Sequence, residues 1–400
     1  MTDAPFTCPF CGIACGDLTA GDMKGCAKAA AGFGAPLLSA EARIGGNAVP
    51  RAAAVREAAR LLREARLPLI SGLAVDLDGI RALLSLADRA GAVIDPWQSR
   101  RTQVNLEVMR RSGTITTTLG EIANRADLVA LLGRDPSTDY PRFFERFIDN
   151  RGGMYRKNRP MVVFLGEKRL APPAHLVDEI IDQPSPQALF DSLGVIAAML
   201  GGEAPPAVPK PLTSLITRFE EAKYGVLLWE AAALAPPAPA IERILRIVEH
   251  LNRKTRCVGF ALGGSGNATG VAQAMLWQAG WPGQVNFADG APRHDPIRYD
   301  SEALVASGET DLLLWAMSLR PTPPPASQIP TIALLPPDAP LDIGAAVEFR
   351  VGVPGLDHGG TLHRADPVVA LPLKATRPAR APNLASLIAE ITRAIEEDRP

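Results

Sequence analysis

Four cysteines near the start of the chain constrain its fold and chemistry more than any other feature. Their spacing is C-x2-C-x3-C-x10-C, at Cys8, Cys11, Cys15 and Cys26. Thiolates are soft ligands, and four of them on a glycine-bearing loop can hold an iron–sulfur cluster or a zinc ion. The alternative is four reduced thiols in a loop that binds nothing. The spacing alone leaves all three states open: a cluster, a zinc ion or no metal.

Length and composition indicate a globular protein of more than one domain. The chain has 400 residues, of which 47% are apolar, and a formal net charge of −1. This charge gives no reason to expect a nucleic-acid partner. We expect no membrane partner, because there is no apolar stretch of about 20 residues, and Asp3 and Cys8 interrupt any secretory signal. Cys257 is isolated, so we expect reduced thiols and a cytoplasmic protein.

Short apolar stretches alternate with amphipathic ones along most of the chain, a pattern typical of a parallel α/β sheet. The expected strands are 67–74, 92–95, 127–133, 161–166, 224–229, 256–262, 311–317 and 331–335. The expected helices are 51–66, 77–89, 141–150, 174–181, 188–200, 241–252, 269–279 and 384–397.

The predicted fold class is therefore α/β, with two doubly wound, Rossmann-like units behind a small N-terminal segment. The cysteine-bearing segment covers residues 1–50. The first α/β unit covers 51–170 and the second 171–345, with a proline-rich linker at 201–211. Residues 346–400 are expected to form a β-rich segment and a final helix that packs back on the core.

A glycine-rich loop lies between a predicted strand and a predicted helix. It contains Gly263, Gly264 and Gly266. Glycines let backbone N–H groups approach a phosphate, and the helix dipole favours negative charge. The loop fits neither the Walker A pattern nor G-x-G-x-x-G, so a tight turn without a ligand is an equal alternative.

Basic residues outnumber acidic ones between residues 142 and 169. Such a surplus can hold a polyanion through charge-assisted hydrogen bonds, and a solvated helix face is the alternative. The candidate contacts are Arg142, Arg146, Arg151, Arg156, Lys157 and Arg159. The five histidines are scattered, and we find neither an H-E-x-x-H motif nor a serine nucleophile elbow. The sequence therefore offers no self-sufficient hydrolase.

Motifs over nearly the whole chain resemble, in order, the B subunit of formylmethanofuran dehydrogenase. The first is Cys8-Pro9-Phe10-Cys11-Gly12-Ile13-Ala14-Cys15, and the most specific is the run Leu119-Gly120-Glu121-Ile122-Ala123-Asn124-Arg125-Ala126-Asp127. The others lie at 133–136, 140–142, 267–270, 287–293, 353–355, 359–361 and 364–366.

The resemblance implies a molybdopterin-oxidoreductase fold. Members of that family carry a tungsten or molybdenum pterin and a [4Fe–4S] cluster, and they reduce CO2 to formate. Their metal is ligated by cysteine or selenocysteine, and alignment on the shared Leu-Gly-Glu places Thr117 at that position. A hydroxyl is hard and stays protonated, so it cannot replace a soft thiolate. The loop from Cys15 to Cys26 is also shorter than in the family, which counts against a cluster.

These departures resemble one branch of the family, the B subunit of the bacterial formyltransferase/hydrolase complex of methylotrophs. In that complex a formyl group passes from formyl-tetrahydromethanopterin to methylofuran, and formyl-methylofuran is hydrolysed to formate. The resemblance implies three partners: an A subunit that is the hydrolase, a C subunit, and a D subunit that is the formyltransferase. It also implies that the complex binds methylofuran, whose glutamate tail would suit the arginine cluster.

We therefore expect a structural subunit that has no activity of its own. Without a metal ligand at Thr117, no tungsten or molybdenum pterin is expected, the cysteines are read as an inherited loop, and Gly263, Gly264 and Gly266 as a vestigial pterin or phosphate loop. The first alternative is an active tungsten or molybdenum subunit. The second is an isolated α/β protein with structural zinc at the cysteines.

Overall fold

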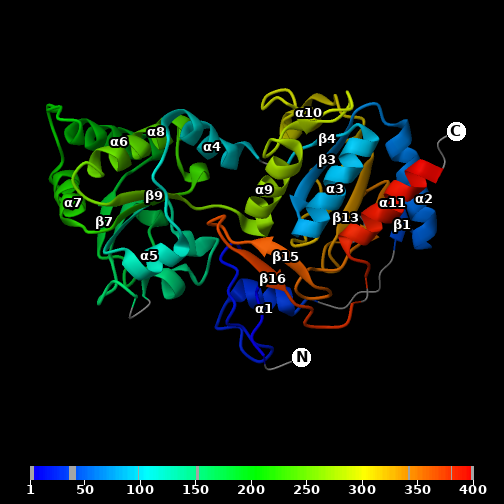
Figure 1. The fold of residues 1–400 in the computed structure, drawn as a ribbon, viewed down its shortest axis with the longest axis horizontal. Coiled ribbons are helices and arrows are strands. Elements are labelled where there is room, and N and C mark those ends of the chain that lie inside the picture. Colours follow the sequence, from blue (N-terminus) through cyan, green and yellow to red (C-terminus); the bar gives the residue numbers. More distant parts are fainter. Residues whose placement is uncertain are drawn as a thin grey trace. The chain divides into compact units, whose positions relative to one another are not determined.

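The protein is an α/β protein that divides into two compact units. A computed structural model describes residues 4–35, 42–97, 99–149, 153–340, 343–379 and 381–397. Unit 1 joins residues 1–100 to 264–400, and unit 2 is the continuous segment 101–263 (Figure 1). Unit 2 is therefore an insertion in the sequence of unit 1.

A nine-stranded sheet forms the centre of unit 1. Its strands are β1 (Ala42–Ile44), β2 (Asn47–Val49), β3 (Pro68–Ala74), β4 (Val93–Ile94), β10 (Val285–Asn286), β11 (Arg293–His294), β12 (Leu312–Met317), β13 (Thr331–Leu335) and β14 (Val347–Arg350). Their order is β11-β10-β4-β3-β12-β13-β14-β1-β2. The central run from β4 to β14 is parallel, and antiparallel strands flank it at both edges.

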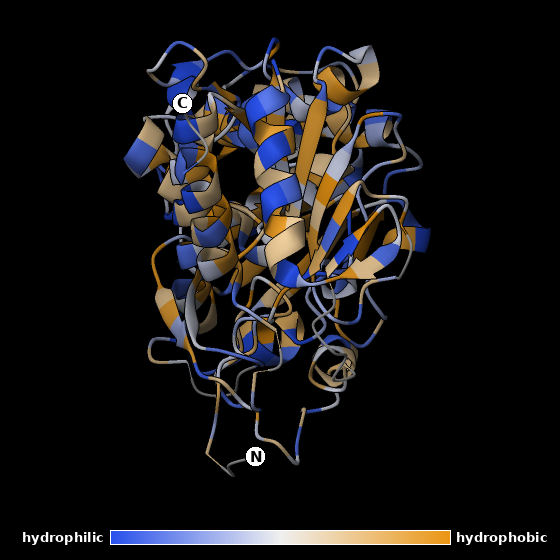
Figure 2. Cartoon of the chain, turned by 90° about the vertical axis from the view of Figure 1, so that its right-hand side faces the viewer, coloured by the Kyte–Doolittle hydropathy of each residue, from blue (hydrophilic) through white to orange (hydrophobic). Residues whose placement is uncertain are grey.

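Four helices pack side by side on one face of this sheet. They are α2 (Arg51–Glu64), α11 (Leu384–Glu397), α3 (Leu77–Ala90) and α9 (Ala268–Ala279), in that order. Alternate strand residues such as Ile70 and Leu314 join their core, whereas Leu69 and Trp315 face the other side, with α10 (Ser301–Ser307). Figure 2 shows the strands largely hydrophobic and the outer faces of the helices largely hydrophilic.

Unit 2 has a five-stranded sheet that is parallel throughout. Its strands are β5 (Leu128–Leu132), β6 (Met161–Gly166), β7 (Glu179–Asp182), β8 (Gly225–Trp229) and β9 (Cys257–Ala261), in the order β7-β6-β5-β8-β9. Its helices are α5 (Leu119–Arg125), α6 (Pro186–Leu200), α7 (Lys210–Glu221) and α8 (Pro237–Leu251), and α4 (Arg100–Ser112) begins at the last residue of unit 1.

The remaining elements are short. In unit 1, α1 (Ala27–Phe33) follows the cysteine loop, and β15 (Gly360–His363) pairs with β16 (Ala370–Leu373). Single helical turns lie at Pro136–Thr138, Phe144–Ile148, Lys168–Leu170, Ala231–Ala233 and Ser265–Asn267. Among the described residues, no helix is long and apolar enough to cross a membrane.

Capping explains why several helices begin and end where they do. The Asp76 carboxylate accepts a hydrogen bond from the Gly79 N–H at the start of α3, and Gly91 ends that helix with a φ of 63°. The Ser185 hydroxyl accepts from the Ala188 N–H at the start of α6, where Pro186 occupies the first helical position.

The α/β class expected from the sequence is confirmed, and three elements keep their expected bounds, at 161–166, 331–335 and 384–397. The expected units, 51–170 and 171–345, differ from the observed ones, because both cross a boundary of the segment 101–263. The alternation of strands and helices gives no sign of which strands pair. Pairing of β3 with β12, which are separated by the whole of unit 2, defines unit 1.

Several expected elements are wrong. The helix expected at 174–181 is absent, because Glu179–Asp182 extends and pairs with β6. The helix expected at 141–150 is only the turn Phe144–Ile148. Helices α4 and α7 were not anticipated, because α4 contains few apolar residues and α7 begins in the expected linker.

Candidate functional site

Thr117, the residue at the expected metal-ligand position, is held just before α5. The hydroxyl of its neighbour Thr118 accepts a hydrogen bond from the Glu121 N–H at 3.0 Å and so caps that helix. On the other side, the Thr116 hydroxyl donates to the Gly259 carbonyl of β9 at 3.1 Å. The backbone is thereby fixed on both sides of Thr117, whose own side chain is buried.

The Thr117 hydroxyl belongs to a small polar network inside unit 2. Its Oγ1 lies 2.8 Å from the Tyr224 hydroxyl and donates to Glu121 Oε2 at 3.2 Å. The Tyr224 hydroxyl lies 3.3 Å from the same carboxylate oxygen. Burial raises the pKa of Tyr224, so its phenol stays protonated near neutral pH. Sequence reasoning identified Thr117 but missed Tyr224, because 107 residues separate them.

The four N-terminal cysteines come together in a compact loop. The Cys8 N–H donates to the Cys15 carbonyl at 2.8 Å, and the Ala14 N–H donates to the Cys11 carbonyl at 3.2 Å. All four side chains are buried free thiols. Burial raises the pKa of Cys8 and Cys11, and nearby thiols raise the pKa of Cys8 further.

This loop does not have the arrangement of a metal site. Within the described residues, no group of three or more His, Cys, Asp or Glu side chains is placed to hold a metal ion. Aromatic packing secures the loop instead, since the Phe33 ring of α1 lies 4.7 Å from Phe6 and 5.0 Å from Phe10, between ring centroids. These contacts hold the loop against α1, and the interpretation of the four cysteines as an inherited loop that binds no metal stays a prediction.

The glycine loop joins strand β9 to helix α9. Gly264 has a φ of 99° and Gly266 a φ of 67°, whereas Gly263 lies on the other side of the unit boundary. The Asn267 amide donates to the Val75 carbonyl at 2.8 Å and accepts from the His363 N–H at 2.8 Å. The described contacts of Asn267 thus anchor the start of α9 to its own unit and do not cap the helix.

The expected arginine cluster does not form one open basic surface. Arg142 is buried and pairs with Glu145, and Arg159 pairs with Asp178 at 2.6 Å. Arg156 is buried and donates to backbone carbonyls, including that of Ala123 at 2.8 Å. Arg146 is half-buried, Lys157 is exposed, and Arg151 lies outside the described residues. At least three of the six side chains therefore have partners within the chain.

Two clefts were not anticipated from the sequence. One, of about 540 Å³, lies in unit 2 at the carboxyl ends of β5 and β6 and contains Gly133, Arg134 and Ser185. Open parallel sheets commonly bind ligands at this edge. The other, of about 740 Å³, follows the solvent side of α3 in unit 1, past Asp78 and Asp88.

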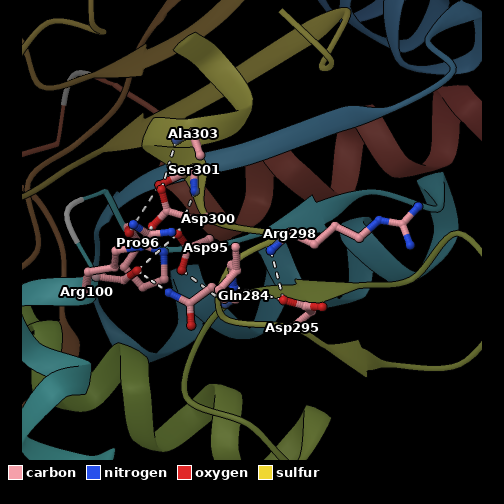
Figure 3. A network of polar contacts seen from close by, with 11 residues as sticks. Asp95, Pro96, Arg100, Gln284, Asp295, Arg298, Asp300, Ser301 and Ala303 are labelled. Carbon is pink, nitrogen blue, oxygen red and sulfur yellow. Dashed lines mark hydrogen bonds and ion pairs between the residues drawn. The ribbon is translucent and has the colours of Figure 1, made fainter. Parts of the chain in front are cut away.

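A buried carboxylate organises one end of the unit 1 sheet (Figure 3). Asp95 follows β4 and accepts hydrogen bonds from the N–H groups of Gln284 at 3.1 Å and Ser301 at 3.0 Å, and from the Ser99 hydroxyl at 3.1 Å. Burial raises the pKa of Asp95 to about 7. Arg100, beside this cluster, pairs with Asp300 at 3.0 Å. The network fastens the segment that precedes α10 to β4.

Comparison with known proteins finds that the chain is similar to B subunits. No family model matches the chain. It is 28% identical over 343 residues to the B subunit of the formyltransferase/hydrolase complex Fhc of Methylorubrum extorquens, covering 85% of this chain and 92% of that protein. A chain in the crystal structure of the FhcABCD complex from Methylorubrum extorquens with methylofuran superposes with a TM-score of 0.78 and 27% identity, covering 89% of this chain and 99% of that one. The chain is related to the B subunit of the Fhc complex.

Two further relatives are subunits of tungsten-containing enzymes. The chain is 27% identical over 397 residues to the B subunit of the tungsten-containing formylmethanofuran dehydrogenase 2 of Methanocaldococcus jannaschii, covering 90% of this chain and 91% of that protein. The corresponding protein of Methanococcus maripaludis is 26% identical over 411 residues, covering 94% and 93%. The family resemblance seen in the motifs is therefore confirmed for both branches.

The residues of this chain do not fit a tungsten or molybdenum pterin at the expected position. Thr117 offers a hydroxyl in place of a thiolate, and that hydroxyl already contacts Tyr224 and Glu121. A protonated, hard oxygen is a poor ligand for such a metal. We therefore derive no redox step through this position.

Proposed function

We propose that the chain is a non-catalytic, structural subunit of a formyltransferase/hydrolase complex. That complex would convert formyl-tetrahydromethanopterin to formate by way of formyl-methylofuran. The observation that carries the proposal is the Thr117 hydroxyl, hydrogen-bonded to Tyr224 and Glu121 at the position where the tungsten family has a metal ligand. Formyl transfer and hydrolysis are not redox reactions, so the subunit can lose this ligand without loss of the pathway.

The proposed partners are the hydrolase, or A, subunit, a C subunit, and the formyltransferase, or D, subunit. The multisubunit composition of the FhcABCD complex, which was crystallised with methylofuran, supports them. We propose methylofuran as the carrier bound by the assembled complex. Five free cysteines support a reducing, cytoplasmic location. Within this proposal, the two α/β units correspond to the doubly wound units of molybdopterin oxidoreductases, and Gly263, Gly264 and Gly266 to a vestigial pterin or phosphate loop.

Fewer of the basic side chains are available to contact the glutamate tail of methylofuran than the sequence suggested. Arg156 donates to backbone carbonyls and Arg142 pairs with Glu145, so neither side chain is available as it stands. Within that set, the exposed Lys157 is the better candidate. Replacing Lys157 with alanine would lower the methylofuran content of the purified complex, and unchanged content would refute the contact.

One experiment separates the structural role from the alternatives. The chain is purified in complex with its partners, and tungsten, molybdenum, iron and zinc are measured together with formyl transfer and hydrolysis. The proposal expects both activities and no stoichiometric tungsten or molybdenum. Stoichiometric tungsten with pterin and formylmethanofuran oxidation would establish the active dehydrogenase instead, which the similarity to the tungsten-containing subunits favours. A monomeric chain with one zinc would establish the isolated zinc protein.

A further inference from the structure

Two large apolar side chains are displayed to solvent on unit 2. Met154 is 75% exposed and the neighbouring Tyr155 is 66% exposed. Lys157 beside them is also exposed. Single exposed apolar residues are ordinary, but a consecutive pair on a well-fixed backbone calls for a physical account.

The backbone that presents this pair is fixed from both sides. The Met154 N–H donates to the Asn124 side-chain oxygen at 2.9 Å, and the Tyr155 N–H donates to the Asn124 carbonyl at 3.1 Å. The Asn124 amide in turn donates to the Gly120 carbonyl at 2.7 Å, so both anchors belong to α5.

The next residue, Arg156, points inward and secures the segment. Its guanidinium donates to the carbonyls of Ala123 at 2.8 Å, Asn158 at 3.0 Å and Ile148 at 3.1 Å. Burying an arginine is costly unless its N–H groups are satisfied, and here carbonyl oxygens satisfy several of them. A buried Arg156 therefore holds Met154 and Tyr155 in their outward positions.

Arg125 completes the exposed surface. Its guanidinium carbon lies 4.6 Å from the centre of the Tyr155 ring, and its Nε lies 3.8 Å from Glu121. The Arg125 side chain is 46% exposed. An arginine stacked on an aromatic ring keeps the N–H groups at its edge available for a carboxylate.

Thr117 contributes to the support of this surface. Glu121, which contacts the guanidinium of Arg125, also accepts the hydrogen bond of the Thr117 hydroxyl. Thr117, Glu121, Arg125 and Tyr155 thus form one continuous series of contacts from the buried network to the surface. Thr117 therefore contributes, through Glu121 and Arg125, to the support of the exposed Tyr155 ring.

We propose that Arg125, Met154 and Tyr155 form a docking surface for another protein subunit. The facing surface of that protein would be an apolar pocket rimmed by carboxylates. Tyrosine and arginine are enriched among residues that dominate interface energies, and a fixed backbone lowers the ordering cost of binding. The positive charge of Arg125 is complementary to the carboxylate rim. A carboxylate-bearing coenzyme tail could use this charge, but it has no pocket for Met154 and Tyr155. The inference rests on the proposed function.

The test is assembly of the full-length chain with the proposed hydrolase, C and formyltransferase subunits. We expect Met154→Ser combined with Tyr155→Ser to weaken assembly at least about tenfold, since truncation of central interface residues has effects of this size. Arg125→Glu should also weaken it. Ile297→Ser is the matched control, because Ile297 is 75% exposed on unit 1 and should leave assembly unchanged. In the wild-type complex, amide hydrogen exchange at 153–157 should slow on assembly.

The outcomes distinguish failure of the proposed function from failure of the docking surface alone. If the wild-type chain does not assemble with these subunits, the proposed function fails and this inference fails with it. If wild type and the variants assemble equally, only the docking surface is refuted. Normal assembly with reduced methylofuran content would assign the surface to the carrier and also refute it. Should the double serine variant unfold, Arg125→Glu and hydrogen exchange on the wild-type complex still give the answer.

Discussion

At the scale of single residues, Thr117 separates this chain from the chemistry that its motifs imply. The sequence identifies the missing thiolate, but only the structure reveals that the hydroxyl is bound by Tyr224 and Glu121. Such a network adds a little stability when it is complete and costs more when one partner is removed. Thr117 therefore has a structural role that can be measured without any metal.

Thr117→Val should destabilise unit 2 by about 1–2 kcal/mol, because it keeps the shape of the side chain but removes a buried hydroxyl and its hydrogen bonds. Tyr224→Phe should cost about 1 kcal/mol, and the double variant should cost less than the sum, because the two hydroxyls contact each other. Denaturant unfolding measures all three variants. Thr217→Val, at an exposed threonine, is the control; strict additivity would contradict the network.

Asp95 should make stability depend on pH near neutrality. Its pKa is about 7 in the folded protein and about 3.9 when unfolded, so between these values the folded state binds more protons. The free energy of unfolding therefore falls as pH rises from about 4 to 7, by up to about 1.4 kcal/mol per pH unit from this group. Above pH 7 its contribution is constant.

The Asp95→Asn variant tests this directly. The amide cannot ionise, so only wild type should lose stability as pH rises. The free energy of unfolding of wild type minus that of the variant should therefore fall between pH 5 and 8. Thermal unfolding at several pH values measures it, with Asp78→Asn at an exposed carboxylate as the control. A difference that is constant over this range would show that Asp95 ionises with an ordinary pKa.

At the scale of elements, aromatic packing holds the cysteine loop, so we predict that its fold needs no metal. Cys8→Ala should cost only about 1 kcal/mol, as for a small buried apolar side chain, and a chelator should not change the melting temperature. Phe10→Ala should cost more, about 2 kcal/mol, because its ring packs against Phe33. The two variants and the chelator-treated protein are compared by thermal unfolding and by limited proteolysis of the N-terminal segment. A large loss of stability on chelation would contradict this account.

The bounds of a helix or strand could be predicted where a strong local sequence pattern determines its conformation. Met161–Gly166 and Leu384–Glu397 have their expected bounds because continuous apolar runs and helical spacing are local properties. The segment Glu179–Asp182 was expected to be helical, yet pairing with β6 determines its conformation. The hydroxyl partner Tyr224 was missed for the same reason, since non-local contacts leave no trace in a single sequence.

At the scale of the whole molecule, the insertion of one unit into the other escapes sequence reasoning. The contacts that define unit 1 join strands far apart in the sequence, such as β3 and β12, whereas those of unit 2 lie within one continuous segment. The proline-rich linker at 201–211 lies inside unit 2 and marks no boundary. The true boundaries fall close to α4 and the glycine loop, neither of which is rich in proline.

This organisation predicts how fragments of the chain behave. The segment 101–263 contains the whole five-stranded sheet and its own core, so it should fold alone, with cooperative unfolding. A fragment covering 51–170 should not, because it takes β3 from one sheet and β5 from the other without their partners β12 and β8. Circular dichroism and denaturant unfolding of the two purified fragments compare them. A cooperative fold for 51–170, or an unfolded 101–263, would mean that the units depend on contacts other than those that define them here.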